Sequence, residues 1–280
     1  MKPAAFTYHR PGTGDEVDAL LEQLGDEAKI LAGGQSLVPI MSMRLAAPAH
    51  VIDINHLADE ATVPVARDEV LVCGPLVRHE AAEHADLVAS RVPLLADALR
   101  FVAHPAIRSR GTVAGSIAHS DPAAELPAVL VALGGSVVAR SARGTRTIPA
   151  QSFFAGPLEN ALDDTEWVTE VRWPAQRGGF AFEEFARRAG DYALCGVAAA
   201  TMRTDTGVHV ALAYLGMGDA PARLEIDADE AVDEAVVALV DERLDPPEDI
   251  HASSAFRRHL GRRLGVRAAR RALEGATTAA

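Results

Sequence analysis

Two short glycine-containing segments hold the residues of this 280-residue sequence that are best suited to bind a ligand. The first is Ala32-Gly33-Gly34-Gln35-Ser36, which directly follows a short apolar run. Paired glycines let the backbone turn and approach a ligand without Cβ clashes, and their N–H groups can form a nest for an anion. Ser36 adds a hydroxyl donor, and a following helical turn would add its positive N-terminal end. Taken alone, however, a Gly-Gly pair after a strand is more often an ordinary tight turn.

The second segment is Gly111-Thr112-Val113-Ala114-Gly115-Ser116, where two glycines again bracket a turn. Its N–H groups and its threonine hydroxyl can face a phosphate. Glu125 follows Gly115 by ten residues and could accept hydrogen bonds from ribose or ribityl hydroxyls; the alternative is an exposed charge in the first turn of a helix. Neither segment fits GxGxxG or GxxxxGK[ST], so neither a Rossmann fingerprint nor a P-loop is supported.

Metal and nucleophile chemistry find little support in the sequence. Cys73 and Cys195 lie far apart without a CxxC partner, whereas a structural zinc or an iron–sulfur cluster usually needs four ligands. We interpret the cysteines as two reduced, buried thiols, with a single disulfide as the alternative. The contiguous His119, Ser120 and Asp121 cannot form a triad, because adjacent residues on an extended chain point apart. We therefore predict no metal site and no catalytic residue here, and we expect most of the ten histidines at the surface or in caps.

Charge and hydropathy exclude further classes of function. With 27 basic and 39 acidic residues the net charge is −12, which argues against a nucleic-acid binder. No stretch approaches the roughly 20 apolar residues that span a bilayer, and the N-terminus has no apolar signal core, so we predict a cytoplasmic protein without a membrane span. Residues 225–249 hold eleven carboxylates and residues 257–271 hold seven arginines. We interpret these as two helices with compensating charges, and a surface that docks a partner is the alternative.

The elements that would position the first glycine segment form a small α/β unit. Thr13 and Glu16 form a capping box, apolar residues follow at helical spacing, and Gly25 ends the predicted helix. Residues 29–32 and 50–54 are predicted strands, and the apolar run up to residue 45 is a helical segment between them. Strand, glycine turn, helix and strand are typical of an α/β arrangement.

Beyond residue 56 the pattern changes to short strands with intervening helices. We predict a helix over 94–103, a turn-rich segment over 108–119, and a helix that opens with Asp121 as N-cap and Pro122 at N1. Strands are predicted at 137–140, 145–149 and 166–173, followed by a linker at 174–179. The predicted strands 180–187, 195–203 and 208–214 then form an antiparallel sheet, and two helices complete an α+β chain.

Taken in order, these segments resemble the FAD-binding (medium) subunit of molybdenum hydroxylases, the group of carbon monoxide, xanthine and nicotine dehydrogenases. The resemblance rests on six segments that run in order over nearly the whole chain: residues 29–37, 51–54, 111–127, 153–156, 187–193 and 249–260. It implies a PCMH-type FAD-binding fold of two α/β subdomains, residues 1–55 and 56–174, followed by a C-terminal antiparallel sheet with a helical bundle, residues 178–280.

The resemblance also implies that FAD lies extended between the first two parts, with its pyrophosphate on both glycine segments. By motif position, the implied FAD-binding residues are Lys29, Ala32, Gly33, Gly34, Gln35, Ser36, Gly111, Thr112, Val113, Ala114, Gly115, Glu125, Leu162 and Tyr192. Tyr192 corresponds to an aromatic residue near the isoalloxazine ring, and a core tyrosine is the alternative. Two departures matter. Relatives often have glycine at Ala114, so a methyl group would face the loop, and they commonly have lysine where Glu184 stands, which would disfavour an anionic reduced flavin.

The implied function is electron transfer by a subunit of a heteromeric molybdenum hydroxylase. FAD on this chain would accept electrons from a [2Fe–2S] cluster on a small partner subunit and pass them to an external acceptor. Molybdopterin would lie on a large partner subunit. The alternatives are a stand-alone FAD-dependent oxidoreductase of related fold and a degenerate scaffold that no longer binds FAD.

Overall fold

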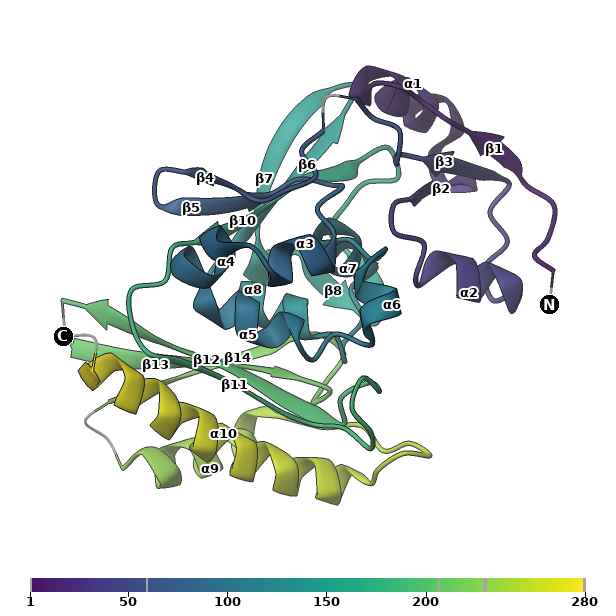
Figure 1. Ribbon diagram of the computed structural model, residues 1–280. Helices are drawn as coiled ribbons and strands as arrows, with labels where there is room; N and C mark the ends of the chain where they lie inside the picture. The colour runs from purple at the N-terminus through teal and green to yellow at the C-terminus, as the bar shows by residue number, and fades with distance from the viewer. Residues whose placement is uncertain (1, 59, 206, 229–230, 279–280) are drawn as a thin grey trace.

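The computed structural model describes residues 2–58, 60–205, 207–228 and 231–278. Within them the chain forms three main sheets (Figure 1). A small parallel sheet lies near the N-terminus, a five-stranded antiparallel sheet follows, and a four-stranded antiparallel sheet lies on the other side of a layer of helices. The last two helices cover the outer face of the four-stranded sheet. The predicted α+β class, with its C-terminal antiparallel sheet and helices, is confirmed.

The N-terminal part brings the first glycine segment to one edge of a parallel sheet. The strand order is β1-β3-β2, with bounds β1 (Thr7–His9), β2 (Ala28–Leu31) and β3 (His50–Asp53). Its helices are α1 (Gly14–Leu24), η1 (Gly25–Glu27) and α2 (Leu37–Ser42). Because all three strands are parallel, their carboxyl ends meet at one edge, where residues 32–36 and residues 53–55 lie side by side.

The capping of α1 follows the sequence prediction on one side only. Thr13 Oγ1 accepts a hydrogen bond from Glu16 N at 3.3 Å, and Gly25 ends the helix with a φ of 52°. The Glu16 carboxylate, however, accepts from Gly12 N at 2.7 Å rather than from Thr13 N. The cap is therefore extended by one residue toward the N-terminus.

The middle part is built on the strand order β4-β5-β10-β6-β7. The bounds are β4 (Val65–Arg67), β5 (Val70–Cys73), β6 (Ser136–Ser141), β7 (Gly144–Pro149) and β10 (Trp167–Pro174). A small hairpin of β8 (Phe154–Gly156) and β9 (Glu159–Asn160) follows η2 (Ala150–Ser152). The helices are α3 (His79–Glu83), α4 (Asp86–Arg91), α5 (Pro93–Leu99), α6 (Pro105–Arg108), α7 (Val113–His119) and α8 (Glu125–Ala132).

Three local predictions for the middle part are wrong. The helix predicted over 94–103 ends at Leu99, and the segment 108–119, predicted to be turn-rich, contains α7 and only the last residue of α6. The helix predicted to open at Asp121 begins at Glu125, because the Asp121 carboxylate accepts from Ala123 N at 2.9 Å and so closes a separate turn. At α7 and α8 a short polar side chain thus determines where the helix starts. Thr112 caps α7, and Asp121 closes the turn before α8.

The C-terminal part is an antiparallel sheet in the order β11-β12-β13-β14, with two helices on its outer face. The bounds are β11 (Phe180–Phe185), β12 (Cys195–Thr204), β13 (Gly207–Leu215), β14 (Ala222–Asp227), α9 (Val232–Arg243) and α10 (Ser254–Thr278). The inner face packs on α5 and α8, so residues such as Phe182 and Leu215 share one core with Leu95 and Leu130.

The charges of the last two helices compensate each other, as interpreted from the sequence. Arg262 pairs with Asp241 at 2.6 Å and Arg270 with Asp233 at 2.5 Å, both across the α9–α10 contact. Arg271 pairs with Glu183 of β11 at 2.6 Å. The alternative of a free arginine-rich docking surface therefore loses support.

No helix in the described ranges is long and apolar enough to cross a bilayer. Cys73 and Cys195 are both buried with free thiols, and burial raises the pKa of each thiol to about 12. The reduced, buried interpretation of the cysteines is confirmed.

Candidate functional site

The two glycine segments, 78 residues apart in sequence, lie against each other. A Cβ atom on Gly33 would stand 2.5 Å from Arg110 O and 2.7 Å from the Cα of Gly111. Both distances are far inside van der Waals contact, and both partners are backbone atoms that cannot rotate away. Only glycine permits this approach, so the residue type at position 33 is fixed by the contact between the two segments.

The first segment presents a row of backbone donors. Gly34 has a φ of 72°, a left-handed conformation that glycine adopts without strain, and α2 begins three residues later. The N–H groups of residues 33–37 donate to no acceptor within the described part of the chain. Successive N–H groups at such a turn point the same way and bind an anion. The Gln35 side chain instead bonds Gly33 O at 3.0 Å and so stiffens the segment.

The second segment is the start of a helix rather than an open turn. Thr112 is the N-cap of α7, and its Oγ1 accepts from Gly115 N at 3.1 Å. Among the described residues, the N–H groups of Thr112 and Ala114 have no acceptor. The side chains of Val113 and Ala114 are buried in the core, so these residues offer only their backbone. The expectation that the Ala114 methyl group faces the loop is therefore wrong: helical backbone turns it inward.

Two residues that the sequence reasoning missed tie the segments together. Asn55 Nδ2 donates to Ala32 O at 2.7 Å, and Arg78 Nη2 donates to Asn55 Oδ1 at 2.5 Å. Arg78 Nη1 also donates to Arg110 O. The chain Ala32–Asn55–Arg78–Arg110 thus links both segments through side chains. The signal in the sequence was the place of Asn55, a polar residue just after a buried strand at the site edge.

The Asp53 carboxylate anchors Asn55 from the strand before it. Asp53 Oδ1 accepts from Asn55 N at 2.9 Å, and Tyr8 Oη donates to Asp53 Oδ2 at 2.6 Å. Burial would raise the pKa of Asp53, but the bonds from Tyr8 and Asn55 together outweigh burial and hold that pKa below its usual value. The carboxylate is therefore ionised and fixed at neutral pH.

His79 lies directly behind the second segment. It is 5% exposed, and neither ring nitrogen has a hydrogen-bond partner within the structure's described ranges. Burial is the main reason that the pKa of His79 falls to about 4, and the positive charges of Arg108 and Arg78 add to the effect. His79 is an exception to the expectation that most histidines lie at the surface or in caps, because it is a neutral buried ring beneath Gly111.

A polar corner lies past the other end of α7. Glu125 is 8% exposed, so its reading as an exposed helix charge is wrong. Burial raises the pKa of Glu125 to about 7, and Asp121 adds to the rise. Tyr192 is 68% exposed, which excludes the alternative of a core tyrosine. Partial desolvation and the nearby carboxyl groups of Asp121 and Glu125 raise its pKa.

The remaining predicted residues lie at different distances from the meeting point of the segments. Ser36 is the residue before α2 and makes no capping bond with its side chain. Leu162 is half-buried against the main core, and its N–H bonds Asn160 Oδ1 at 2.9 Å, next to the end of α7. Lys29 is exposed near the start of β2, three residues before Ala32, so the structure does not bring it to the segments.

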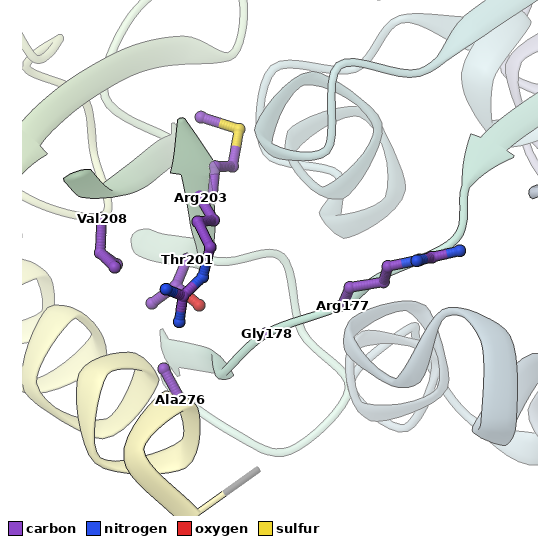
Figure 2. A pocket seen from close by; sticks show the side chains of 7 residues that line it. Arg177, Gly178, Thr201, Arg203, Val208 and Ala276 are labelled. Atoms are coloured by element: carbon purple, nitrogen blue, oxygen red, sulfur yellow. The ribbon is translucent and has the colours of Figure 1, made fainter. Parts of the chain in front are cut away.

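Two hollows in the described surface lie away from the glycine segments. The one shown in Figure 2 has a volume of about 100 Å³ and lies between the linker at Gly178, the end of β12 and the end of α10. Arg177 extends away from it and pairs with Glu69 at 2.7 Å. Ligand pockets usually measure about 300–1,000 Å³, so this junction is too small for a nucleotide cofactor. A shallow hollow of about 490 Å³ beside Tyr8, Arg10 and Leu20 is not lined by the glycine segments either.

The donor set at the segments fits the diphosphate of FAD. It offers backbone N–H groups from two segments, the start of a helix and the guanidinium of Arg78, and all of these favour an anion. The described residues contain no group of three histidines, cysteines or carboxylates arranged around a metal. The site is thus suited to hold an extended, negatively charged cofactor along α7. Residues 32–36 and 111–115 form an anion seat at the start of α7, and the polar corner lies past its other end.

Comparison with known proteins identifies the family. Residues 4–176 match the family described as the FAD-binding domain in molybdopterin dehydrogenase, and residues 180–272 match the CO dehydrogenase flavoprotein C-terminal domain. The chain is 37% identical over 271 residues to the nicotine 6-hydroxylase medium subunit of Paenarthrobacter nicotinovorans, covering 93% of this chain and 94% of the relative. It is 41% identical over 227 residues to the caffeine dehydrogenase subunit beta of Pseudomonas sp. (strain CBB1), covering 80% and 77%.

A solved structure agrees over the whole chain. Carbon monoxide dehydrogenase from Hydrogenophaga pseudoflava, in a form that lacks the Mo-pyranopterin moiety, contains a chain that matches with a TM-score of 0.91 and 33% identity. The match covers 100% of this chain and 99% of that one. The chain therefore belongs to the family of FAD-binding medium subunits of molybdenum-containing dehydrogenases, which are subunits of oxidoreductases.

Proposed function

We propose that this chain carries FAD as the electron-transfer subunit of a heteromeric molybdenum hydroxylase. Electrons reach the flavin from a [2Fe–2S] cluster on a small partner subunit and leave to an external acceptor, while the substrate is oxidised on a large molybdopterin subunit. The observation that carries the proposal is the contact of Gly33 with Arg110 and Gly111, which joins two sets of backbone donors into one anion seat. The cytoplasm is the proposed location.

Backbone atoms provide most of the proposed contacts to FAD. The diphosphate lies on residues 32–36 and 111–115, and Arg78 adds a positive charge that the family resemblance alone did not assign. The hydroxyls of FAD bond Glu125, Leu162 packs against the cofactor, and Tyr192 lies beside the isoalloxazine ring. Lys29, on β2, is proposed for the adenine end.

When bound, FAD supplies the redox chemistry, because it accepts electrons singly or in pairs. The residues of this chain orient it and shield its diphosphate. No general acid, base or nucleophile is needed on the chain for electron transfer. The relatives named as a nicotine 6-hydroxylase and a carbon monoxide dehydrogenase act on different substrates, which agrees with a subunit that does not choose the substrate.

The test is purification of the native complex, followed by a visible spectrum and identification of the chains that accompany this one. We expect a flavin spectrum on this chain, with molybdenum and iron on the other chains. Reduction of the flavin should then require the iron–sulfur subunit when the substrate of the complex is added. A purified chain that oxidised a small substrate unaided would favour the stand-alone oxidoreductase. A chain that stayed colourless after addition of FAD would favour the degenerate scaffold.

A further inference from the structure

Two carboxyl groups from different parts of the fold meet in the polar corner. Glu125 opens α8, and Glu184 stands on β11. Side chains alternate along a strand, so Phe182 and Glu184 face the middle part of the molecule. The ring of Phe182 lies 5.1 Å from that of Phe101, which fixes the direction of this face. Glu183 faces the other way, where Arg267 and Arg271 pair with it.

Neither carboxyl group of the corner is neutralised by a base. Within the part of the chain that the structure describes, Glu125 forms no ion pair or hydrogen bond with another residue. Glu184 Oε2 is fully buried without a hydrogen-bond partner, although the residue as a whole is partly exposed. An orphaned buried carboxyl oxygen is costly unless it carries a proton or meets a ligand.

The electrostatics of the corner favour the protonated form. Burial raises the pKa of Glu184 to about 8, and the neighbouring Glu125 carboxyl adds to the rise. Asp121 also faces Glu125 and opposes a further negative charge there. The neutral hydroxyl of Tyr192 lies near both of these carboxyl groups. Since like charges in one buried site cannot both ionise, the pair keeps a proton at neutral pH.

A cation near this corner already has other partners. Arg257 of α10 acts on Cys195 of β12, which pairs with Phe185, the residue after Glu184. Its Nη1 donates to Leu194 O at 2.6 Å and its Nη2 to Asp249 Oδ2 at 2.7 Å. The guanidinium therefore stabilises the end of the sheet and does not pair with the two glutamates.

The corner lies where the flavin half of FAD would reach. Helix α7 has seven residues, so it extends about 10 Å from the anion seat toward Glu125. We propose that Glu184, protonated beside Glu125, offers its buried carboxyl group as a hydrogen-bond donor to the flavin half of FAD, so that FAD affinity depends on the protonation of this pair. The proposal rests on the proposed function, and it adds Glu184, on the C-terminal sheet, to the cofactor site.

The sign of the pH dependence follows from linkage. Bound FAD covers the corner and adds negative charge, so it raises the affinity of the pair for its proton. At pH values where the pair is deprotonated in the free chain, FAD binding is therefore accompanied by uptake of a proton by the pair. FAD affinity must therefore fall as the pH rises through the range in which the free pair deprotonates.

The test is a fluorescence titration of the FAD-free full chain with FAD at several values between about pH 6 and about pH 9. For the wild type we expect affinity to fall about tenfold or more over this range. The double variant Glu125→Gln/Glu184→Gln keeps two amide donors but has no titrating glutamate in the corner, so its affinity should change less than about threefold. Glu183→Gln is the matched control, because it removes a carboxylate from the same strand on the opposite face and should keep the wild-type profile.

A second readout does not depend on FAD. The infrared spectrum of the free chain near pH 7 should contain the C=O band of a protonated carboxyl, and the double variant Glu125→Gln/Glu184→Gln should remove it. A flat wild-type profile, an unchanged profile in the double variant, or a missing band would each overturn the proposal. A different result would be a wild-type chain that bound no FAD at any pH but still showed the infrared band of the protonated carboxyl. That result would overturn the proposed function, because the chain would then not be an FAD-binding subunit.

Discussion

At the scale of single residues, the site depends on the absence of a side chain at Gly33. Its missing side chain lets residues 31–36 touch residues 110–112, and the backbone donors of both segments then face the same space. A side chain elsewhere in the site can be replaced with a loss of one contact. A side chain added at this position separates the two halves of the seat.

We predict that Gly33→Ala loses FAD. The added Cβ would meet backbone atoms 2.5–3.0 Å away, so the segments must move apart and the diphosphate loses half of its donors. FAD affinity should fall at least about tenfold, which corresponds to about 1.4 kcal/mol. Gly12→Ala is the control, because a Cβ there would stand 3.9 Å from its nearest neighbour, the Glu16 carboxylate. Equal flavin content in both variants would contradict the assignment.

His79 predicts how acid affects stability. Its pKa is about 4 in the folded chain and about 6.5 when exposed. Between these two values His79 is therefore mostly protonated in the unfolded chain and mostly neutral in the folded chain. The free energy of unfolding should therefore decrease as the pH falls from about 6.5 to about 4, by about 3 kcal/mol in total. Urea unfolding at about pH 7.5 and about pH 4 measures this decrease.

The comparison variant is His79→Asn, which is polar but does not titrate in this range. Its free energy of unfolding should depend less on pH between those two values than that of the wild type. The same slope in both chains would show that His79 is not the titrating group.

The residues of the site differ in how far the sequence could predict them. Gly33 and Gly34 were predictable, because the need for glycine after a strand is local. The burial of Glu125 was not, because α8 packs on β12 and β13, which begin 70 residues or more further along the chain. Asn55 and Arg78 were missed for the same reason: each acts through a partner that only the tertiary structure brings near.

At the scale of elements, α1 holds the parallel sheet in place on the middle part. Asp18 is buried and accepts from Trp167 Nε1 of β10 at 2.8 Å and from Arg140 Nε of β6 at 2.8 Å. Both partners lie on the five-stranded sheet, whereas α1 packs on β3. One carboxylate therefore fixes the position of the first glycine segment relative to the second.

We predict that Asp18→Ala both destabilises the chain and weakens FAD binding. It leaves the buried indole N–H of Trp167 without an acceptor, which costs about 1–3 kcal/mol. Asp15→Ala is the control, because that side chain also pairs with Arg140 but is 93% exposed, so its loss should cost less than about 1 kcal/mol. Urea unfolding and FAD titration of both variants measure the two effects. Equal losses in the two variants would contradict this role of Asp18.

The element boundaries show what local sequence signals can and cannot decide. The start and end of α1 were predicted because Thr13 and Gly25 act within one turn. The start of α8 was misplaced because Asp-Pro is a good cap, yet here the aspartate closes a turn whose carbonyl at Pro122 accepts from Gly216 N at 2.8 Å. A bond to the far end of β13 thus overrides the local preference.

At the scale of the whole molecule, the middle and C-terminal parts share one core. Phe182 of β11 and Leu215 of β13 belong to the same cluster as Leu95 of α5 and Leu130 of α8. The boundary between the two matched families, at residues 177–179, therefore separates sequence families but not hydrophobic cores. The division of the chain at residues 55, 174 and 178 stays a prediction.

We predict that the middle and C-terminal parts unfold together. Phe182→Ala should cost about 3–5 kcal/mol and lower the melting temperature of both parts equally, because the ring is buried between them. Thermal melts followed by near-UV and far-UV circular dichroism should coincide. Phe256→Ala, at a partly exposed ring, is the control and should shift the melt less. Two separate transitions, with only one of them shifted, would contradict a shared core.

The distance in sequence between the two glycine segments has a consequence for biosynthesis. Gly111 leaves the ribosome 78 residues after Gly33, which corresponds to roughly 4–16 seconds of synthesis. Glu184 and Tyr192 follow more than 70 residues later still. A nascent chain therefore has no complete seat to offer until most of it has been made. Cofactor loading in the proposed site belongs to the end of folding, after translation has delivered the C-terminal sheet.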